Sequence, residues 1–179
     1  MLKSEKAVLA VIDVQGRLAT LMHQKDDFFR NVVRMIKGAK TLGLPILWNE
    51  QLPDKLGDTI AEIRQELPDL KPMAKKTFSC CGNDEFLAKL KGLGRKQVLV
   101  VGMETHVCVY QTASDLINAG YEVYLVADAV SSRTLENKQI GTEAIRDLGA
   151  SVTSVEMALF EILHTAEGDR FKQIIQIVK

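Results

Sequence analysis

The 179-residue sequence has no excess of charge of either sign, because 23 lysines and arginines balance 23 aspartates and glutamates. Nucleic acids and anionic membrane surfaces are bound largely through clustered positive charge, so a neutral chain without a basic cluster gives no reason to expect either partner. No segment approaches the roughly 18 consecutive apolar residues of a membrane-spanning helix. We therefore expect neither nucleic acid nor membrane as a partner.

Cysteine is scarce, with only Cys80, Cys81 and Cys108 in the chain. An odd number cannot pair completely, and two adjacent cysteines rarely close a disulfide, so the simplest compartment is the reducing cytoplasm. We interpret the start, MLKSEKAVLAVIDVQ, as a first strand rather than a signal peptide, because its apolar run is short and leads straight into Asp13.

Several motifs for bound groups are absent as well. There is no G-x-G-x-x-G and no G-x-x-x-x-G-K-[ST], so dinucleotide and P-loop sites lack their phosphate-binding loops. A G-x-S-x-G elbow is also missing, which disfavours a serine hydrolase. The order and spacing of Cys80, Cys81, His106 and Cys108 fit no common zinc pattern. We therefore expect no metal and no cofactor.

Apolar, β-branched runs alternate with segments of helical period along the whole chain. The pattern predicts strands at 7–13, 45–50, 71–76, 97–103, 121–129 and 150–154. It predicts helices at 27–43, 57–67, 84–94, 105–120, 135–149, 155–164 and 169–177. Asp58 is the expected N-cap of the second helix.

This alternation predicts an α/β fold with a parallel sheet. Runs such as QVLVV show no polar alternation, as expected for strands that are covered on both faces. No repeat or linker divides the sequence, so residues 1–179 are expected to form a single domain. Ligands in such sheets bind beyond the carboxyl ends of the strands. This rule directs attention to Asp13, the 49–51 turn, the 75–79 segment and the 102–108 loop.

Three positions at these strand ends carry reactive side chains, and each has an ordinary alternative. Asp13 could be a base or the cap of a following helix. Lys75 and Lys76 could stabilise a thiolate or hold Asp13, or they could form a solvated edge. Cys108 lies near the start of a helix that begins around Thr105, where the helix dipole would lower the pKa of a thiol. It could equally be a small apolar filler, since cysteine is among the most buried residue types.

Three stretches of the sequence are similar to a known family: AVIDVQGRL (10–18), KKTFSCC (75–81) and VVGMETHVCVYQTASDLINAGYEVYLVADAVSS (100–132). With them the chain resembles the isochorismatase-like, or cysteine hydrolase, superfamily over nearly its whole length. WNEQLPDKLGDT (48–59) is most similar to the small isochorismatase-domain-containing hydrolases, many of which have no assigned substrate. The resemblance implies a three-layer α/β/α, Rossmann-like hydrolase fold with a six-stranded parallel sheet in the order 3-2-1-4-5-6.

The resemblance also implies a catalytic triad. Cys108 matches the family's nucleophile and Asp13 its general base. The family's lysine stands four residues before the serine of a K-x-x-[FY]-S pattern, which in KKTFS assigns the third role to Lys75. The doubled lysine leaves Lys76 as the alternative.

A cis peptide bond between Met103 and Glu104 is implied in the same way. It would turn the Glu104 N–H toward the site, where the Glu104 and Cys108 N–H groups would form an oxyanion hole. Further residues are expected to line the substrate pocket because of their positions: Gln51, Thr105 and His106.

The sequence differs from two groups of the superfamily in ways that disfavour their activities. Nicotinamidases of the superfamily carry an Asp/His/His metal site after the second strand, whereas WNEQLPDKLGD contains no histidine. Isochorismatases that hydrolyse a vinyl ether replace the nucleophile, whereas this chain keeps Cys108. The prediction is therefore cysteine-dependent hydrolysis of a small amide-type C–N bond through a Cys108 thioester.

Two other functions stay open at this point. The chain could be a non-catalytic, oligomeric binding or scaffold member of the family, or a thiol redox sensor that uses Cys80, Cys81 and Cys108. The resemblance implies a homo-oligomer, commonly a dimer or tetramer, and a small-molecule substrate as the partner.

Overall fold

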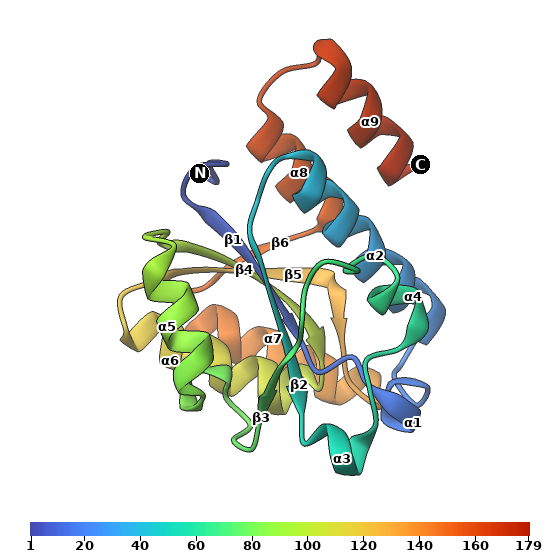
Figure 1. The fold of residues 1–179 in the computed structure, drawn as a ribbon, viewed down its shortest axis with the longest axis vertical. Helices are drawn as coiled ribbons and strands as arrows, with labels where there is room; N and C mark the ends of the chain where they lie inside the picture. The colour runs from blue at the N-terminus through green and yellow to red at the C-terminus, as the bar shows by residue number, and fades with distance from the viewer.

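A computed structural model describes residues 1–179 and contains one six-stranded parallel sheet (Figure 1). Its strands are β1 (Ala7–Ile12), β2 (Ile46–Gln51), β3 (Met73–Lys75), β4 (Gln97–Met103), β5 (Glu122–Ser131) and β6 (Ser151–Thr153). They lie in the order β3-β2-β1-β4-β5-β6, and every neighbouring pair is parallel. The predicted sheet and its order are confirmed.

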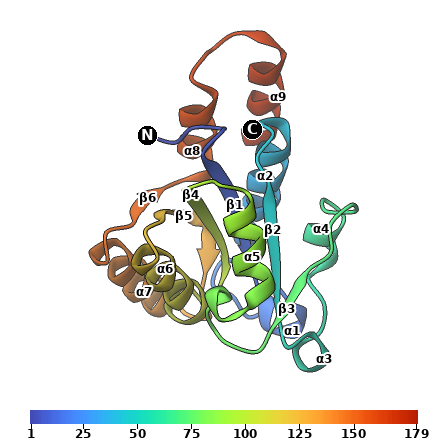
Figure 2. The same cartoon turned by 60° about the vertical axis from the view of Figure 1, so that its left-hand side comes forward.

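Helices cover both faces of the sheet, as Figures 1 and 2 show from two directions. The helices are α1 (Gly16–Ala19), α2 (Lys25–Thr41), α3 (Pro53–Leu56), α4 (Ala61–Arg64), α5 (Asp84–Gly92), α6 (Tyr110–Asn118), α7 (Leu135–Asp147), α8 (Val155–Leu163) and α9 (Gly168–Val178). A 3₁₀ turn, η1 (Cys80–Gly82), precedes α5, and a π-helical turn, η2 (Thr105–Val109), precedes α6. None of the helices has the length and apolar character needed to cross a bilayer.

The central strand β1 explains why the sheet needs two covering layers. All six of its residues are fully buried, and successive side chains of a strand point to opposite faces. Val8, Ala10 and Ile12 join the core under α5, α6 and α7. Leu9 and Val11 join the core under α2, α8 and α9. The chain thus buries two apolar cores and leaves the carboxyl ends of the strands for polar side chains.

The predicted helix at 57–67 is wrong. Within this segment only α4 (Ala61–Arg64) is an α-helix; residues 57–60 are not helical and connect it to α3, which ends at Leu56. Gly57 has a φ of +81°, and the Thr59 N–H donates to Glu50 Oε1 at 2.7 Å instead of to a helical carbonyl. Asp58 caps no helix; its side chain pairs with Arg64 at 3.3 Å. The long-range bond to β2 outweighs the local helical pattern.

Gly102 is required where β4 approaches β1. Its φ is +142°, and a Cβ added there would lie 2.2 Å from the Ile12 carbonyl oxygen. We predict that Gly102→Ala lowers the free energy of unfolding by more than about 1 kcal/mol, because the backbone must shift. The matched control is Gly92→Ala in α5, whose added methyl meets nothing within 4 Å. Urea denaturation of both variants checks this, and equal stabilities would contradict it.

Candidate active site

Asp13 follows the last residue of β1, at the carboxyl edge of the sheet. It is a non-glycine residue with φ of +56°, and its side chain is buried. Its backbone N–H donates to the Asn49 carbonyl at 3.1 Å, which continues the ladder between β1 and β2. The helix-cap alternative is wrong, because α1 begins at Gly16 and Gln15 occupies the cap position. The carboxylate instead points to groups from other strands.

Lys75 is the last residue of β3 and contacts Asp13 across the edge of the sheet. Its Nζ donates to Asp13 Oδ2 at 2.6 Å and to Gln51 Oε1 at 2.6 Å. It also donates to the backbone oxygens of Phe78 at 2.9 Å and Thr77 at 3.2 Å. The Lys75 side chain has no exposed area. These acceptors fix the ammonium group against the carboxylate.

Lys76, the neighbouring lysine, is exposed to solvent. Alternation along the short strand β3 places the two lysines on opposite sides, with Lys75 inward and Lys76 outward. Of the doubled lysine in KKTFS, therefore, Lys75 lies at the site.

Cys108 lies in η2, directly after β4, and its side chain is almost completely buried. The chain enters η2 through Glu104, which has the left-handed values φ 57° and ψ 63°. The expected cis peptide between Met103 and Glu104 is wrong, since the structure contains no cis peptide bond. The turn between strand and helix is made instead by the unusual backbone angles of Gly102 and Glu104.

The pKa values at this site are shifted mainly by burial. Burial raises the pKa of the Cys108 thiol to about 12; the charge of Asp13 adds to the rise, and Lys75 opposes it. Lys75 lowers this pKa, as expected, but burial outweighs it, so the expected net lowering of the thiol pKa is wrong. Burial also raises the pKa of Asp13, while the ammonium of Lys75 and the hydrogen bond from Cys108 lower it. Cys108 therefore rests as a thiol beside Asp13.

A hollow of about 390 Å³ opens above these groups. Its lining combines the polar residues Asp13, Gln51, Glu104 and Arg133 with Cys108, Leu18, Leu56, Phe78, Met103 and Val107. Volumes of roughly 300 to 1,000 Å³ are usual for small-molecule sites. The carboxylate, the thiol and the expected Gln51 thus share one pocket, and Lys75 lies beneath it.

Thr105 and His106 do not line this pocket. Thr105 is fully buried, and its Oγ1 has no hydrogen-bond partner. The His106 ring instead faces the end of β5, with Nδ1 3.0 Å from Ser132 Oγ and Nε2 3.4 Å from Glu104 Oε2. A position in the turn next to the cysteine is therefore not enough to place a side chain in the pocket.

Comparison with known proteins identifies the family to which this fold belongs. The family model described as the isochorismatase domain matches residues 7–157. The chain belongs to this family. The sequence-based prediction of the isochorismatase-like family is therefore confirmed.

Relatives of this isochorismatase-family chain cover nearly all of it. The secreted isochorismatase effector Isc1 of Phytophthora sojae is 39% identical over 97% of this chain and 84% of its own. The MAR1 ribonuclease of Caenorhabditis elegans superposes with a TM-score of 0.92 at 29% identity, covering 99% of this chain and 91% of that one. The YcaC gene product of Escherichia coli, described as an octameric hydrolase of unknown specificity, has a TM-score of 0.92 at 23% identity, covering 98% and 88% of the two chains.

Sequence reasoning missed Gln15, which organises the floor of the isochorismatase-family site. This side chain is fully buried, and its Oε1 accepts from the Gln51 N–H at 2.6 Å. Its Nε2 donates to the Gly57 carbonyl at 2.7 Å and to the Gln51 carbonyl at 3.2 Å. The sequence feature that could have identified Gln15 is its position two residues after Asp13, at the carboxyl end of the same strand.

Arg133 was missed as well. It follows the carboxyl end of β5, and its Nε donates to Glu104 Oε1 at 3.0 Å at the pocket wall. The rule that ligands bind at the carboxyl ends of strands, applied to β5, would have selected it.

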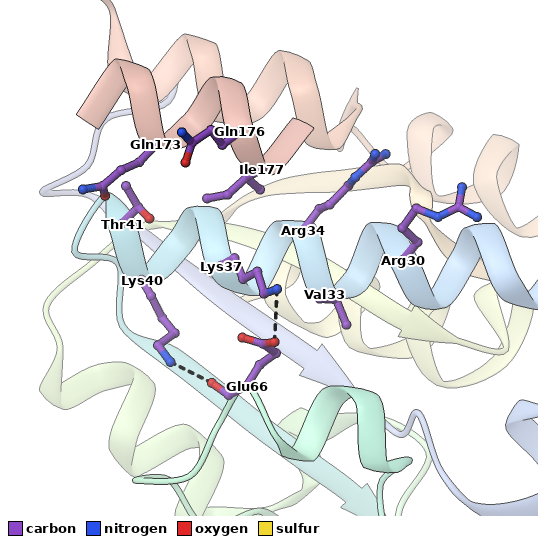
Figure 3. Close-up of a pocket in the computed structure, with 10 residues that line it drawn as sticks. All are labelled: Arg30, Val33, Arg34, Lys37, Lys40, Thr41, Glu66, Gln173, Gln176 and Ile177. Carbon is purple, nitrogen blue, oxygen red and sulfur yellow. Dashed lines mark hydrogen bonds and ion pairs between the residues drawn. The ribbon is translucent and has the colours of Figure 1, made fainter. Parts of the chain in front are cut away.

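A second hollow of this isochorismatase-family chain, larger than the Cys108 pocket, lies between α2, α9 and the segment after α4 (Figure 3). It measures about 570 Å³ and is rich in cations. Two of them form ion pairs within the chain, Lys37 with Glu66 at 3.3 Å and Arg30 with Asp27 at 2.8 Å, whereas Arg34 only donates to the Asn31 amide oxygen at 3.5 Å. Lys40 donates to the Glu66 carbonyl at 2.9 Å. The groove contains neither a cysteine nor a histidine, in contrast to the Cys108 pocket, which contains a thiol.

The raised thiol pKa makes a prediction for alkylation. Only the thiolate reacts with iodoacetamide, so the rate at Cys108 should climb about tenfold per pH unit and keep climbing above pH 9, toward its pKa of about 12. Peptide mass spectrometry at a series of pH values measures this rate separately for each cysteine. A plateau already reached below pH 8 would show that Cys108 rests as a thiolate.

Proposed function

We propose that this isochorismatase-family chain is a cysteine hydrolase that cleaves small amide-type C–N bonds through a thioester on Cys108. Asp13 is the general base and Lys75 the third member of the triad. The observation that carries the proposal is the buried 2.6 Å contact between Lys75 Nζ and Asp13 Oδ2, because Asp13 and the Cys108 thiol line the same pocket. A buried ion pair is costly to maintain, so its place beside a nucleophile favours a chemical role.

In the first half of the reaction, Asp13 accepts the proton of Cys108 as the sulfur attacks the substrate carbonyl carbon. The thiol is not ionised at rest, because burial raises its pKa to about 12. Burial also raises the pKa of Asp13, which makes the carboxylate a stronger base. The nucleophile is therefore generated by proton transfer during attack and not stored as a thiolate.

The tetrahedral intermediate carries a negative oxygen that needs hydrogen-bond donors. We assign this role to the backbone N–H of Cys108, at the start of the helical segment η2–α6. The Glu104 N–H is the second proposed donor, but its orientation no longer has the support of a cis peptide, because the Met103–Glu104 bond is trans. Collapse of the intermediate breaks the C–N bond, and protonated Asp13 gives its proton to the leaving amine.

In the second half, water enters after the amine has left. Asp13 removes a proton from the water while the water oxygen attacks the thioester carbonyl carbon. The C–S bond breaks, the carboxylic acid leaves, and Asp13 returns the proton to Cys108 sulfur. Lys75 stays bound to Asp13, Gln51 and two backbone oxygens throughout, so it holds the carboxylate in place without exchanging protons.

The redox-sensor alternative has less support than hydrolysis. All three cysteines are free, and burial raises the pKa of the Cys80 thiol and raises that of Cys81 to about 11. Sensor cysteines need accessible thiols of low pKa. A non-catalytic binding role would leave the pairing of Lys75 with Asp13 at the pocket floor unexplained.

The name of the Caenorhabditis elegans relative raises a ribonuclease function. We do not extend it to this chain, because its charge is balanced, and two of the four cations around the groove of Figure 3 form ion pairs within the chain. We propose a homo-oligomer, with a dimer or tetramer as the expected state, and light scattering tests it. The cytoplasmic location stays a prediction; the Phytophthora relative is named a secreted effector.

A screen of small amides, ureas and carbamates tests the proposed activity. Release of the amine is followed for the purified chain, with Asp13→Asn as the matched control that keeps the shape of the side chain but removes the base. Turnover by the parent that disappears in the control supports the proposal. Hydrolysis that persists in Asp13→Asn would rule out Asp13 as the base.

A further inference from the structure

We propose that the ion pair between Glu104 and Arg133 makes this pocket reject anionic groups, so that the substrate is a small amide that carries no negative charge and has an apolar body. The inference deepens the proposed hydrolysis and rests on it for the identity of the reaction. It concerns specificity, which the triad itself does not determine.

The pair closes one wall of the Cys108 pocket. Arg133 Nε donates to Glu104 Oε1 at 3.0 Å, and both residues line the hollow. The Glu104 side chain is 9% exposed and that of Arg133 is 54% exposed. The carboxylate therefore lies inside the pocket wall, while the guanidinium covers it from the rim.

The other carboxylate oxygen of Glu104 faces His106. This Oε2 is buried without a hydrogen bond, 3.4 Å from His106 Nε2. His106 Nδ1 in turn lies 3.0 Å from Ser132 Oγ. Glu104 thus has the neighbours needed to keep its carboxylate at the pocket, and turning it away would leave Arg133 without its partner.

The charges around the pocket cancel in two pairs. Lys75 neutralises Asp13 at 2.6 Å, and Arg133 neutralises Glu104 at 3.0 Å. The other lining side chains are Gln51, whose amide is already bonded on both sides, and apolar residues. A substrate carboxylate would have to lose its water beside two carboxylates with no unpaired cation to receive it. A neutral amide meets no such penalty.

Without Glu104 the balance would change. Arg133 would then present an unopposed guanidinium at the rim, which is the side chain best suited to bind a carboxylate in a bidentate manner. Glu104 is therefore the residue that determines specificity, because it suppresses anion binding by Arg133.

Alkylation of Cys108 by two probes of similar size tests this without a known substrate. Iodoacetamide is neutral and iodoacetate carries a carboxylate. Both rates are measured at Cys108 by peptide mass spectrometry at one alkaline pH and divided by the rates for a small free thiol. We expect the parent protein to disfavour iodoacetate, and Glu104→Gln to raise the iodoacetate-to-iodoacetamide ratio by about tenfold or more.

Two further variants make the result specific to the pair. Arg133→Met should lower the same ratio, because it leaves the Glu104 carboxylate unopposed. The double variant restores neutrality and should return the ratio close to that of the parent. Because Arg133 is half exposed, its replacement should be tolerated even if Glu104→Gln folds poorly.

A ratio that is the same in the parent, Glu104→Gln and Arg133→Met would overturn the inference while leaving the hydrolase proposal intact. If the ratios changed as expected in the variants but the protein hydrolysed no amide, the selectivity inference would stand and the hydrolase proposal would be overturned. If Cys108 reacted with neither probe, the pocket would be closed and both proposals would be wrong.

Discussion

Replacing Cys108 with alanine should abolish amide hydrolysis and leave the fold intact. Loss of a nucleophile that acts together with its base lowers kcat by about 10⁴-fold or more in comparable hydrolases. The substitution removes one buried sulfur and keeps Cβ, so its cost in stability should be only about 1 kcal/mol. Initial rates on the best amide of the screen, together with urea denaturation, measure both effects.

Cys81→Ala is the matched control for this result. Cys81 is partly exposed and does not line the Cys108 pocket. It should therefore keep the parent rate. Full activity of the Cys108→Ala variant, or equal losses in both variants, would contradict the assignment of Cys108 as nucleophile.

Replacing Lys75 with methionine should produce the largest loss of stability of any single change at the site. It leaves the Asp13 carboxylate buried without its cation, and breaking a buried pair in this way costs about 3–5 kcal/mol. It also removes the donor to Gln51 Oε1 and to two backbone oxygens. Urea denaturation at neutral pH measures the loss, and amide hydrolysis should fall with it.

Lys76→Met provides the control, since Lys76 is exposed and adjacent in sequence. Its effect should stay within about 0.5 kcal/mol. A double variant, Lys75→Met with Asp13→Asn, should be more stable than Lys75→Met alone, because no buried charge remains. Equal effects of Lys75→Met and Lys76→Met would show that the 2.6 Å contact contributes no stability.

The pH dependence of this variant follows from Asp13. Burial already raises the pKa of Asp13 above its ordinary 3.8, and loss of Lys75 removes an opposing influence. A carboxyl group whose pKa is raised in the folded state binds more protons when folded, so its contribution to stability is lost as the pH rises through that pKa. The deficit of Lys75→Met should therefore shrink as the pH is lowered toward 3.8.

Much of the fold could be predicted from the sequence because each strand has a local pattern of apolar, β-branched residues. Gln97–Met103 is a β-branched run with no polar alternation, and the observed strand has the predicted bounds. The order of the six strands came from the resemblance to a family. The 57–67 helix failed because its outcome depends on a hydrogen bond between Thr59 and Glu50, which a local pattern does not contain.

The part of the site that consists of single polar residues at the carboxyl ends of strands could be predicted from the sequence. Asp13, Lys75 and Gln51 meet as expected, because the carboxyl ends of β1, β2 and β3 lie side by side. The thiol pKa was not predictable, since it depends on burial and on the charge of Asp13, both of which require the folded structure. The ion pair between Glu104 and Arg133 could not be predicted, because its two residues follow different strands, β4 and β5, and no local sequence pattern indicates that they are in contact.

Intact-protein mass spectrometry during turnover of a slow amide tests the central claim most directly. The account predicts an added mass equal to the acyl group, located on the peptide that contains Cys108 and absent from the Cys108→Ala protein. Turnover by the parent with no acyl adduct at any time, or an adduct on Cys80 or Cys81 instead, would contradict it.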